Sequence, residues 1–460
     1  MRIGFLPLYI ALYDESGFAA RHRLEPFYET LAKALEEKGF EVLRSPFCRV
    51  EEEFRNAVSS FEKEGAEALV TWHAAYSPSL ESARVLAGTE LPLVILDTTE
   101  TFDFSPRQNP EEINFCHGIH GVMDLGNLLR RLGKPFAIAA GHFPSSPVID
   151  RVSEYLAAAK AAKGMRGMRV GLVGRSFPGM GDFLIDDRTL FDRFGVTVVR
   201  AGGEKLRAFK DAVTEDEISR EVSRDLHDSI KLVPYSETAH RLTAKNGLAV
   251  RRWLEEEGLG AFTASFLDIT PALGLDVMPF MEACRAMERG IGYAGEGDVM
   301  TAALTGALLK GFPGKVSFVE IFCPDWAHDT LFLSHMGEMN YALADGEKEL
   351  KTMDFIYGEA SDPVVGYARY RAGRAVFVNL FPKKDGFGLL LSPVEMEAPA
   401  GEDRFAGNVR GWMKPAVPVA EFLEKLTRAG ATHHSALVYD ASPEALSHFG
   451  ELLGLDVVRI

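Results

Sequence analysis

The sequence predicts an α/β protein with parallel sheets, followed by a C-terminal antiparallel sheet or barrel. Over the first two thirds of the chain, short apolar runs alternate with amphipathic helical stretches. This rhythm is typical of an open parallel sheet covered by helices. After about residue 312, the predicted strands are short, β-rich and separated by Gly, Pro and Asp, as in antiparallel sheets and barrels. With 460 residues, the chain has room for about three domains.

The first region begins with a predicted strand over residues 3–8. These residues could pass for a weak signal peptide, but Pro7 interrupts the apolar stretch and Asp14 and Glu15 follow it, so a buried strand is favoured. Residues 91–96 are apolar on both faces, as expected inside a parallel sheet. The other strands predicted here are 40–43, 68–72 and 135–140, and the helices are 24–38, which ends at Gly39, 50–64 and 120–132.

A helix over 145–163 leads to a predicted boundary near residue 165, and a second region of the same kind follows it. Its predicted strands are 168–173 and 196–200, and its helices are 214–229, 236–257 and 299–309. The β-rich region has predicted strands at 316–322, 330–333, 363–368, 375–380, 386–391 and 435–439, with helices at 419–429 and 444–453. We therefore expect three domains, over 1–164, 165–311 and 312–460.

Composition excludes several classes of function. The formal net charge is −16 and the pI is near 5.3, which argues against binding nucleic acid or an anionic membrane as the main role. The four cysteines form no C-x-x-C pair and fit reduced thiols in a cytoplasmic protein. No apolar run approaches about 18 residues, so no transmembrane helix is expected.

Familiar catalytic motifs are absent. The chain has no P-loop, no G-x-S-x-G and no H-E-x-x-H. Glycines at 171, 174, 179 and 181 follow a predicted strand, but their spacing is not G-x-G-x-x-G and no clear acidic partner follows. A plain strand-to-loop turn is the favoured interpretation over a dinucleotide loop.

Two carboxylates have unusual surroundings. Glu296 lies between two glycines just before a predicted helix, where the backbone can bring it close to a ligand. The alternative is an ordinary loop residue near a helix N-terminus, where negative charge is favoured. Glu320 is flanked by Val319 and Ile321 in a predicted strand, so it should be paired or bound to a cation if it is buried. An exposed strand residue is equally compatible with the pattern.

Histidines follow later in the chain. His335 comes after a short strand, and His433 and His434 precede another. A lone histidine is more often structural, and adjacent histidines point in different directions, so we expect at most one of His433 and His434 to serve a given site. Two carboxylates and two imidazoles would suit Mn²⁺, Mg²⁺ or a similar divalent cation. Zinc is less favoured because no thiolates cluster with them.

The same residues resemble the L-arabinose isomerase family and, more distantly, L-fucose isomerases. Residues 292–298, GYAGEGD, are similar to the F-A-G-E-G-D stretch of that family, and the Glu320 strand is similar to its S-F-M-E-D-Y strand. Residues 334–336, SHM, resemble its G-S-H-M, and residues 430–434, GATHH, resemble its G-G-A-H-H. Upstream, His120-Gly121 and Gly141-His142 resemble its H-G-G and G-H-W segments, and residues 76–78, YSP, resemble its F-S-P turn, so the resemblance spans about residues 70–440.

This resemblance implies two Rossmann-like domains followed by a β-barrel domain, and a metal-dependent aldose–ketose isomerase that acts on a pentose or deoxyhexose. It implies one divalent cation, most commonly Mn²⁺, with Mg²⁺ or Co²⁺ as alternatives, and a homo-oligomer, a hexamer or trimer, with the active site at the subunit interface. His120 and His117 would bind the substrate held by the next subunit. The implied ligands are Glu296, Glu320, His335 and His434.

The implied reaction runs through an enediolate, with Glu296 and Glu320 as the acid/base pair. The ligand histidines would be neutral, with their N–H groups held by acceptors. The chain departs from the family pattern: Ile321-Phe322 replace Asp-Tyr, and His117 stands where the family has Gln. These departures put L-arabinose itself in question as the substrate. Two alternatives stay open: a non-catalytic sugar-binding or regulatory homologue, and another enediolate reaction, such as an epimerase or lyase step.

Overall fold

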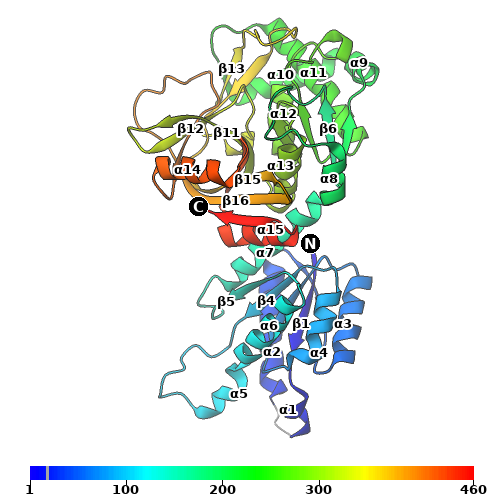
Figure 1. The fold of residues 1–460 in the computed structure, drawn as a ribbon, viewed down its shortest axis with the longest axis vertical. Coiled ribbons are helices and arrows are strands. Elements are labelled where there is room, and N and C mark those ends of the chain that lie inside the picture. The colour runs from blue at the N-terminus through cyan, green and yellow to red at the C-terminus, as the bar shows by residue number, and fades with distance from the viewer. Residues whose placement is uncertain (17–19) are drawn as a thin grey trace. The chain divides into compact units, whose positions relative to one another are not determined.

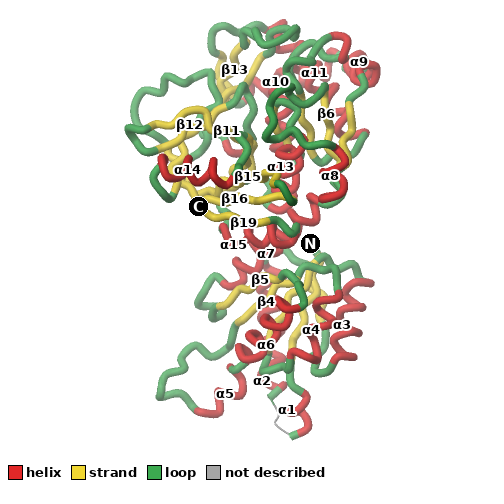
Figure 2. The backbone as a smooth tube through the Cα atoms, in the orientation of Figure 1, coloured by secondary structure: helices red, strands yellow, loops and turns green. Residues whose placement is uncertain are grey.

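A computed structural model describes residues 1–16 and 20–460. By its internal contacts the chain divides into two compact units, residues 1–160 and 161–460, which we call the first and second units. Figures 1 and 2 show strands flanked by helices in the first unit, and a second unit in which a helical region adjoins a strand-rich one. Among the described residues, no helix is long and apolar enough to cross a membrane.

The first unit contains a five-stranded sheet in which every pairing is parallel, in the order β2-β1-β3-β4-β5. Its strands are β1 (Arg2–Leu8), β2 (Glu41–Arg44), β3 (Ala68–His73), β4 (Leu93–Asp97) and β5 (Phe136–Ala140). Its helices are α1 (Ala11–Glu15), α2 (Arg21–Glu37), α3 (Glu51–Lys63), α4 (Ser79–Gly88), α5 (Ile113–Cys116) and α6 (Gly118–Arg131); α7 (Val148–Met165) runs on into the second unit.

Both faces of this sheet are covered. On one face, Leu6 and Leu8 belong to a core cluster that includes Phe54 of α3, Leu86 of α4 and Leu125 of α6. On the other face, Phe5 stacks on Tyr28 of α2, with ring centroids 4.7 Å apart. Burial on both faces accounts for the apolar, non-alternating strands that the sequence shows.

His73, at the end of β3, is 4% exposed and sits against two glycines of α6. A Cβ atom added at Gly121 would lie 2.5 Å from His73 Cδ2, and one at Gly118 would lie 2.4 Å from the His73 carbonyl oxygen. Only glycine therefore lets the helix approach this closely. Burial lowers the pKa of His73 to about 3, so the imidazole is neutral in the folded chain.

His73 should make the first unit sensitive to acid. The unfolded chain protonates this imidazole below its ordinary pKa of 6.5, whereas the folded chain resists protonation down to about 3. Its contribution to stability is therefore complete above pH 6.5 and is lost as the pH falls, with a slope approaching about 1.4 kcal/mol per pH unit. We expect His73→Phe to reduce this slope, measured by hydrogen exchange of β3 amides between about pH 7 and about pH 5. An equal slope in both proteins would contradict the assignment.

The second unit begins with a four-stranded parallel sheet in the order β10-β9-β6-β7. Its strands are β6 (Arg169–Val173), β7 (Thr197–Arg200), β9 (Ala261–Ala264) and β10 (Gly292–Gly295). The helices of this region are α8 (Asp187–Phe194), α9 (Gly203–Asp211), α10 (Glu215–His227), α11 (Glu237–Glu256), α12 (Phe280–Glu288) and α13 (Val299–Gly311).

Helix α13 joins this sheet to the barrel. All its residues from Val299 to Leu309 are buried, as expected for a helix that is apolar all round. It packs against β9 and β10 on the sheet side and against β11 and β18 on the barrel side. Gly292 of β10 allows this contact, because a Cβ atom there would lie 2.2 Å from the Gly306 nitrogen. The N-terminus of α13 is thereby fixed beside the barrel.

The C-terminal region contains a closed, six-stranded antiparallel barrel in the order β15-β18-β11-β12-β17-β16, closed by the pairing of β15 with β16. The predicted fold class, parallel-sheet α/β domains followed by an antiparallel barrel, is confirmed. The barrel strands are β11 (Val316–Asp325), β12 (Thr330–Ser334), β15 (Gly373–Lys383), β16 (Gly386–Glu397), β17 (Gly411–Pro415) and β18 (His434–Tyr439). Strand β19 (Asp456–Arg459) adds in parallel to β16, and α14 (Val419–Ala429) and α15 (Pro443–Leu452) are the helices of this region.

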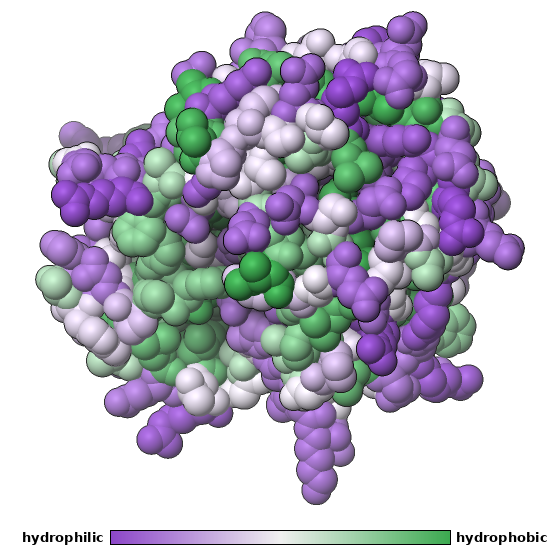
Figure 3. Space-filling view, turned by 90° about the horizontal axis from the view of Figure 1, so that it is seen from above, coloured by the Kyte–Doolittle hydropathy of each residue, from purple (hydrophilic) through white to green (hydrophobic). Residues whose placement is uncertain are grey.

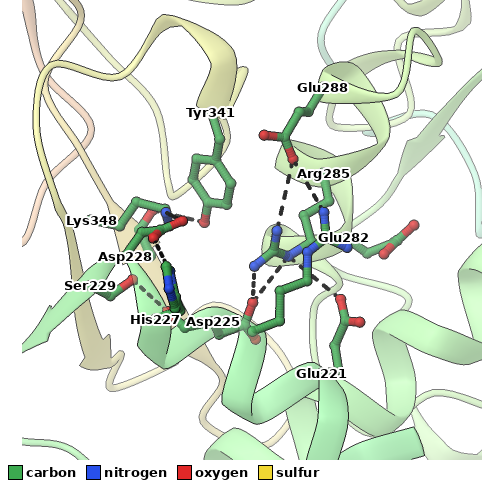
Figure 4. Close-up of polar contacts among 12 residues, drawn as sticks. Glu221, Asp225, His227, Asp228, Ser229, Glu282, Arg285, Glu288, Tyr341 and Lys348 are labelled. Atoms are coloured by element: carbon green, nitrogen blue, oxygen red, sulfur yellow. Dashed lines mark hydrogen bonds and ion pairs between the residues drawn. The ribbon is translucent and has the colours of Figure 1, made fainter.

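A small fourth sheet, of β8 (Ser229–Lys231), β13 (Lys348–Thr352) and β14 (Val364–Tyr367), adjoins a buried ion pair. Arg285 of α12 donates from Nε to Asp225 Oδ1 of α10 at 3.0 Å, and both residues are buried. Figure 4 shows the guanidinium of Arg285 reaching Asp225 on one side and Glu288 on the other. The second oxygen of Asp225 lies 3.0 Å from His240 Nε2. This one carboxylate therefore contacts two buried side chains, Arg285 and His240.

Removal of the Asp225 carboxylate should destabilise the second unit strongly. Asp225→Ala leaves Arg285 and His240 buried without their acceptor, and such a change costs about 3–5 kcal/mol of unfolding free energy. Asp192, whose side chain is exposed and paired with Arg188, is the matched control, and Asp192→Ala should change stability by less than about 1 kcal/mol. Urea denaturation measures both. Equal effects would contradict the structural role of the buried pair.

The surface is mostly hydrophilic, interrupted by apolar patches, as Figure 3 shows for one face. The large apolar side chains that are most exposed in the second unit include Val233, Ile356 and Trp326. Single exposed apolar residues are normal in soluble proteins, and we assign these no role.

Candidate functional site

The predicted ligand side chains meet where three barrel strands approach the N-terminus of α13. In the barrel register, Glu320 of β11 pairs with His434 of β18 on one side and with Ser334 of β12 on the other. His335 follows Ser334 directly. Antiparallel pairing places directly opposite side chains about 4.5–5.5 Å apart, so the register itself brings Glu320, His335 and His434 to one place.

Glu296 reaches the same place from the loop between β10 and α13. Its backbone has a φ of 62°, a left-handed conformation that non-glycine residues rarely adopt and that is often found at functional sites. Gly295, just before it, faces His335: a Cβ atom there would lie 2.7 Å from His335 Cε1. Gly297, just after it, has a φ of 78°. The glycines on both sides of Glu296 are therefore required by space and by conformation.

The ligand atoms form two overlapping groups. Glu320, His335 and His434 each offer an atom within 4.8 Å of the others, and so do Glu296, His433 and His434. His335 Nε2 lies 3.6 Å from Glu320 Oε2, and His434 Nε2 lies 3.5 Å from Glu296 Oε2. The structure thus brings together all four predicted ligands, and His433 joins them.

Each of these histidines is held by a carboxylate at Nδ1, which leaves Nε2 directed at a glutamate. The Nδ1 atom of His335 is 2.6 Å from Glu338 Oε2, and that of His434 is 3.0 Å from Asp298 Oδ2. Metal-binding histidines usually have such a partner, which sets the tautomer and the direction of the ring. Glu338 is fixed in turn by the Tyr293 hydroxyl, which donates to its Oε1 at 2.9 Å.

The two carboxylate oxygens of Asp298 have different partners. Its Oδ1 accepts a hydrogen bond from the backbone N–H of Thr301 at 2.9 Å, which caps α13, while its Oδ2 faces His434. Asp298 is fully buried, and a carboxylate at a helix N-terminus is favoured by the helix dipole. The helix start and the direction of the His434 ring are therefore fixed by the same side chain.

Aromatic rings and a glycine-containing loop enclose the group. Phe183 stacks on His434 with ring centroids 5.0 Å apart and an interplanar angle of 8°, and the edge of Phe318 contacts both His335 and His434. The loop after β6 also touches Glu296, because the Phe177 N–H donates to the Glu296 carbonyl at 2.9 Å. The loop that carries the glycines at 174, 179 and 181 thus lines one side of the site.

Burial and neighbouring charge shift the pKa values in opposite directions. Burial raises the pKa of the Glu320 carboxyl, which brings it closer to neutral pH. Burial also tends to lower the pKa of His335, but the carboxylates of Glu338 and Glu320 outweigh it and raise that pKa to about 9. The pKa values of both groups are raised, and such perturbed groups in one buried cluster are typical of sites that carry charge or transfer protons.

Two buried atoms of the cluster have no hydrogen-bond partner: Glu296 Oε2 and His434 Nε2. Buried polar atoms are rarely left unpaired, and these two face each other across 3.5 Å. Carboxylate oxygens and imidazole nitrogens with carboxylate-held rings suit a divalent cation of the Mn²⁺ type. The residues present therefore fit the divalent cation that the family resemblance implies.

Comparison with known proteins agrees with this arrangement. The L-arabinose isomerase central domain matches residues 189–310, and the L-arabinose isomerase C-terminal domain matches residues 315–456. The chain belongs to the L-arabinose isomerase-like family. The matched ranges include all four predicted ligands.

Individual relatives cover most of the chain. L-arabinose isomerase from Nocardioides sp. is 26% identical over 85% of this chain and 80% of its own length. L-arabinose isomerase 1 from Bacillus licheniformis is 25% identical over the same shares, and L-arabinose isomerase from Bacillus subtilis is 25% identical over 92% of this chain and 86% of its own. A solved arabinose-transporter binding protein from Shewanella sp. ANA-3, 11% identical over 68% of this chain and 84% of its own, has a TM-score of only 0.18, too low to indicate a shared fold.

The two predicted substrate-binding residues, His117 and His120, lie in the first unit. His117 precedes α6, and its Nε2 lies 2.9 Å from the Tyr13 hydroxyl, while its Nδ1 lies 2.7 Å from the Ile113 carbonyl oxygen. His120 is exposed one turn later, with its ring centroid 6.1 Å from that of His117. These two histidines thus form a pair at the start of α6.

Sequence reasoning missed the carboxylates that hold the histidine rings. It expected acceptors for the N–H groups without identifying Glu338, Asp298 or Asp182. The signal available for Glu338 was its position three residues after His335, and for Asp298 its place before a helix. Nothing in the sequence connects Asp182 with His433, which are 251 residues apart.

Proposed function

We propose that this chain is a divalent-cation-dependent aldose–ketose isomerase of a sugar, with Glu296, Glu320, His335 and His434 as the ligands. The observation that carries the proposal is the convergence of these four side chains, with two buried atoms that lack any other partner. The L-arabinose isomerase relatives supply the reaction class. Mn²⁺ is the favoured cation for this oxygen and nitrogen set, with Mg²⁺ and Co²⁺ as alternatives.

The C2 proton of an aldose is too weakly acidic to leave unaided. A bound divalent cation would supply Lewis-acid stabilisation of the charge that develops on the sugar oxygens. One of the two glutamates then takes the proton from C2 while the other exchanges a proton with O1 and O2, and the proton returns at C1 by way of an enediolate. The burial that raises the Glu320 pKa favours this carboxyl as a proton carrier near neutral pH.

The remaining groups hold this geometry. Glu338 and Asp298 keep Nε2 of His335 and His434 directed inward, and the aromatic rings of Phe183 and Phe318 limit the access of water. Exclusion of water strengthens the electrostatic interactions inside a site and protects a reactive enediolate. The exposed Phe322, where the family has Tyr, alters the edge of the site and is consistent with a substrate other than L-arabinose.

Proton NMR in D₂O tests the function directly. The full chain is incubated with Mn²⁺ and a panel of aldoses and ketoses, with EDTA as the control. We expect deuterium to enter C1 or C2 as a ketose appears, in the Mn²⁺ sample only. Exchange without a ketose would indicate an epimerase or lyase, and no exchange with any sugar would contradict the proposal.

We further propose that the active site is shared between copies of the chain in a homo-oligomer, a hexamer or trimer. Large apolar side chains are exposed near His120 on the first unit: Ile119 and Met123 lie on the same helix, and Ile113 lies on α5. Exposed apolar groups of this kind mark association surfaces. A second copy that brings its ligand cluster against His120 would cover them and add a substrate-binding imidazole.

Mixed oligomers test this sharing. His120→Ala and Glu320→Gln chains should each be inactive alone, because each lacks one half of every site. When the two are unfolded and refolded together, some sites combine an intact His120 with an intact Glu320, and activity of roughly a quarter of wild type should return. Failure to regain activity, with mixed oligomers shown to form, would contradict a shared site.

A further inference from the structure

His433 is paired with a carboxylate in the same way as the two predicted histidine ligands. Its Nδ1 lies 2.7 Å from Asp182 Oδ2, and the same oxygen accepts the His433 backbone N–H at 2.9 Å. His335 with Glu338 and His434 with Asp298 show the same pairing of Nδ1 with a carboxylate. This is the arrangement by which proteins direct the other nitrogen of a histidine to a cation.

The Nε2 atom of His433 is directed at the candidate centre. It lies 3.6 Å from Glu296 Oε2, the same oxygen that lies 3.5 Å from His434 Nε2. Ligand atoms that share a cation at about 2.1 Å are about 3.0–3.5 Å apart in octahedral or tetrahedral geometry. The distances from Glu296 Oε2 to the two imidazole nitrogens are therefore close to those of a ligand set.

The packing holds both histidine rings in place. Phe183 stacks on His434 and contacts His433 with ring centroids 5.5 Å apart, and it is almost fully buried. Asp182 directly precedes Phe183 in the loop after β6. Two consecutive residues of this loop therefore hold the rings: Asp182 orients His433, and Phe183 packs against both imidazoles.

We propose that His433 is a third imidazole ligand, which joins Glu296, Glu320, His335 and His434 around the same cation. This inference rests on the cation site of the proposed function. A third imidazole favours late first-row cations such as Co²⁺ over Mn²⁺.

Titration with Co²⁺ tests the proposal without any sugar. The full chain is freed of metal, and the binding of Co²⁺ is followed by calorimetry and by visible absorption, which reports the ligands of the ion. We expect His433→Ala and His433→Gln to weaken Co²⁺ binding by at least about tenfold and to change the spectrum, and Asp182→Asn to weaken it by about tenfold. Mn²⁺ binding should weaken less in each variant.

The control is His328→Ala. His328 is also paired through Nδ1 with a carboxylate, at 2.9 Å from Asp325 Oδ2, but it is exposed and lies outside both groups, so its loss should leave Co²⁺ binding unchanged. Unchanged affinity and an unchanged spectrum in both His433 variants, folded by circular dichroism, would overturn the proposal while leaving the isomerase function intact. Failure of the wild-type chain to bind Co²⁺ or Mn²⁺ would overturn the cation site itself, and this inference with it.

Discussion

Replacement of Glu320 by glutamine is expected to lower isomerase turnover by about 10³-fold or more while the chain stays folded. Glutamine keeps the size of the side chain and one oxygen, but it can neither accept the substrate proton nor supply a negative charge. Proton transfer by a positioned group contributes about 10²–10⁴-fold to rates, and loss of a charged ligand adds to the effect. Turnover is measured as ketose formed per subunit with saturating Mn²⁺.

The matched control is Glu395→Gln, which removes an exposed carboxylate from another strand of the same barrel. It should leave turnover and stability unchanged, since exposed substitutions rarely alter stability by more than about 0.5 kcal/mol. Circular dichroism and the thermal midpoint show whether Glu320→Gln is folded. Turnover within about tenfold of wild type in a folded variant would remove Glu320 from the acid/base pair.

The pattern of apolar runs was sufficient to predict all five strands of the first sheet. Strands such as β1 and β3 are buried on both faces, so their sequence is continuously apolar and easy to detect. Short elements were missed: β10 has the sequence Gly-Tyr-Ala-Gly, which resembles a loop because α13 packs so closely on it that only small residues fit at Gly292. Closure of the barrel depends on the pairing of β15 with β16 and on long-range register, which composition does not specify. The two predicted boundaries between the three domains stay a prediction.

Short motifs around the four predicted ligands indicate the candidate site. Each motif is short because the ligands come from separate elements, which are brought together by the folded structure and not by the local sequence. The barrel register places Glu320 opposite His434, although they are separated by 114 residues in sequence, and no local pattern encodes that pairing. The adjacent histidines illustrate the limit of local reasoning. Adjacent histidines point in different directions, which predicts that at most one of His433 and His434 serves the site. His433, however, precedes β18 and lies in a loop, so its ring is free to turn toward Glu296.

Removal of divalent cations should abolish turnover and lower the thermal midpoint of the second unit. Without a cation, Glu296 Oε2 and His434 Nε2 are buried without a hydrogen-bond partner, an arrangement that costs free energy. Binding to the folded chain alone stabilises it by about 2.7 kcal/mol when the cation is at a hundred times its Kd. We therefore expect EDTA to lower the midpoint and the activity together, and added Mn²⁺ to restore both at the same concentration. Because the midpoint is measured without sugar, an EDTA-sensitive activity with an unchanged midpoint would mean that the cation binds elsewhere or only with the substrate.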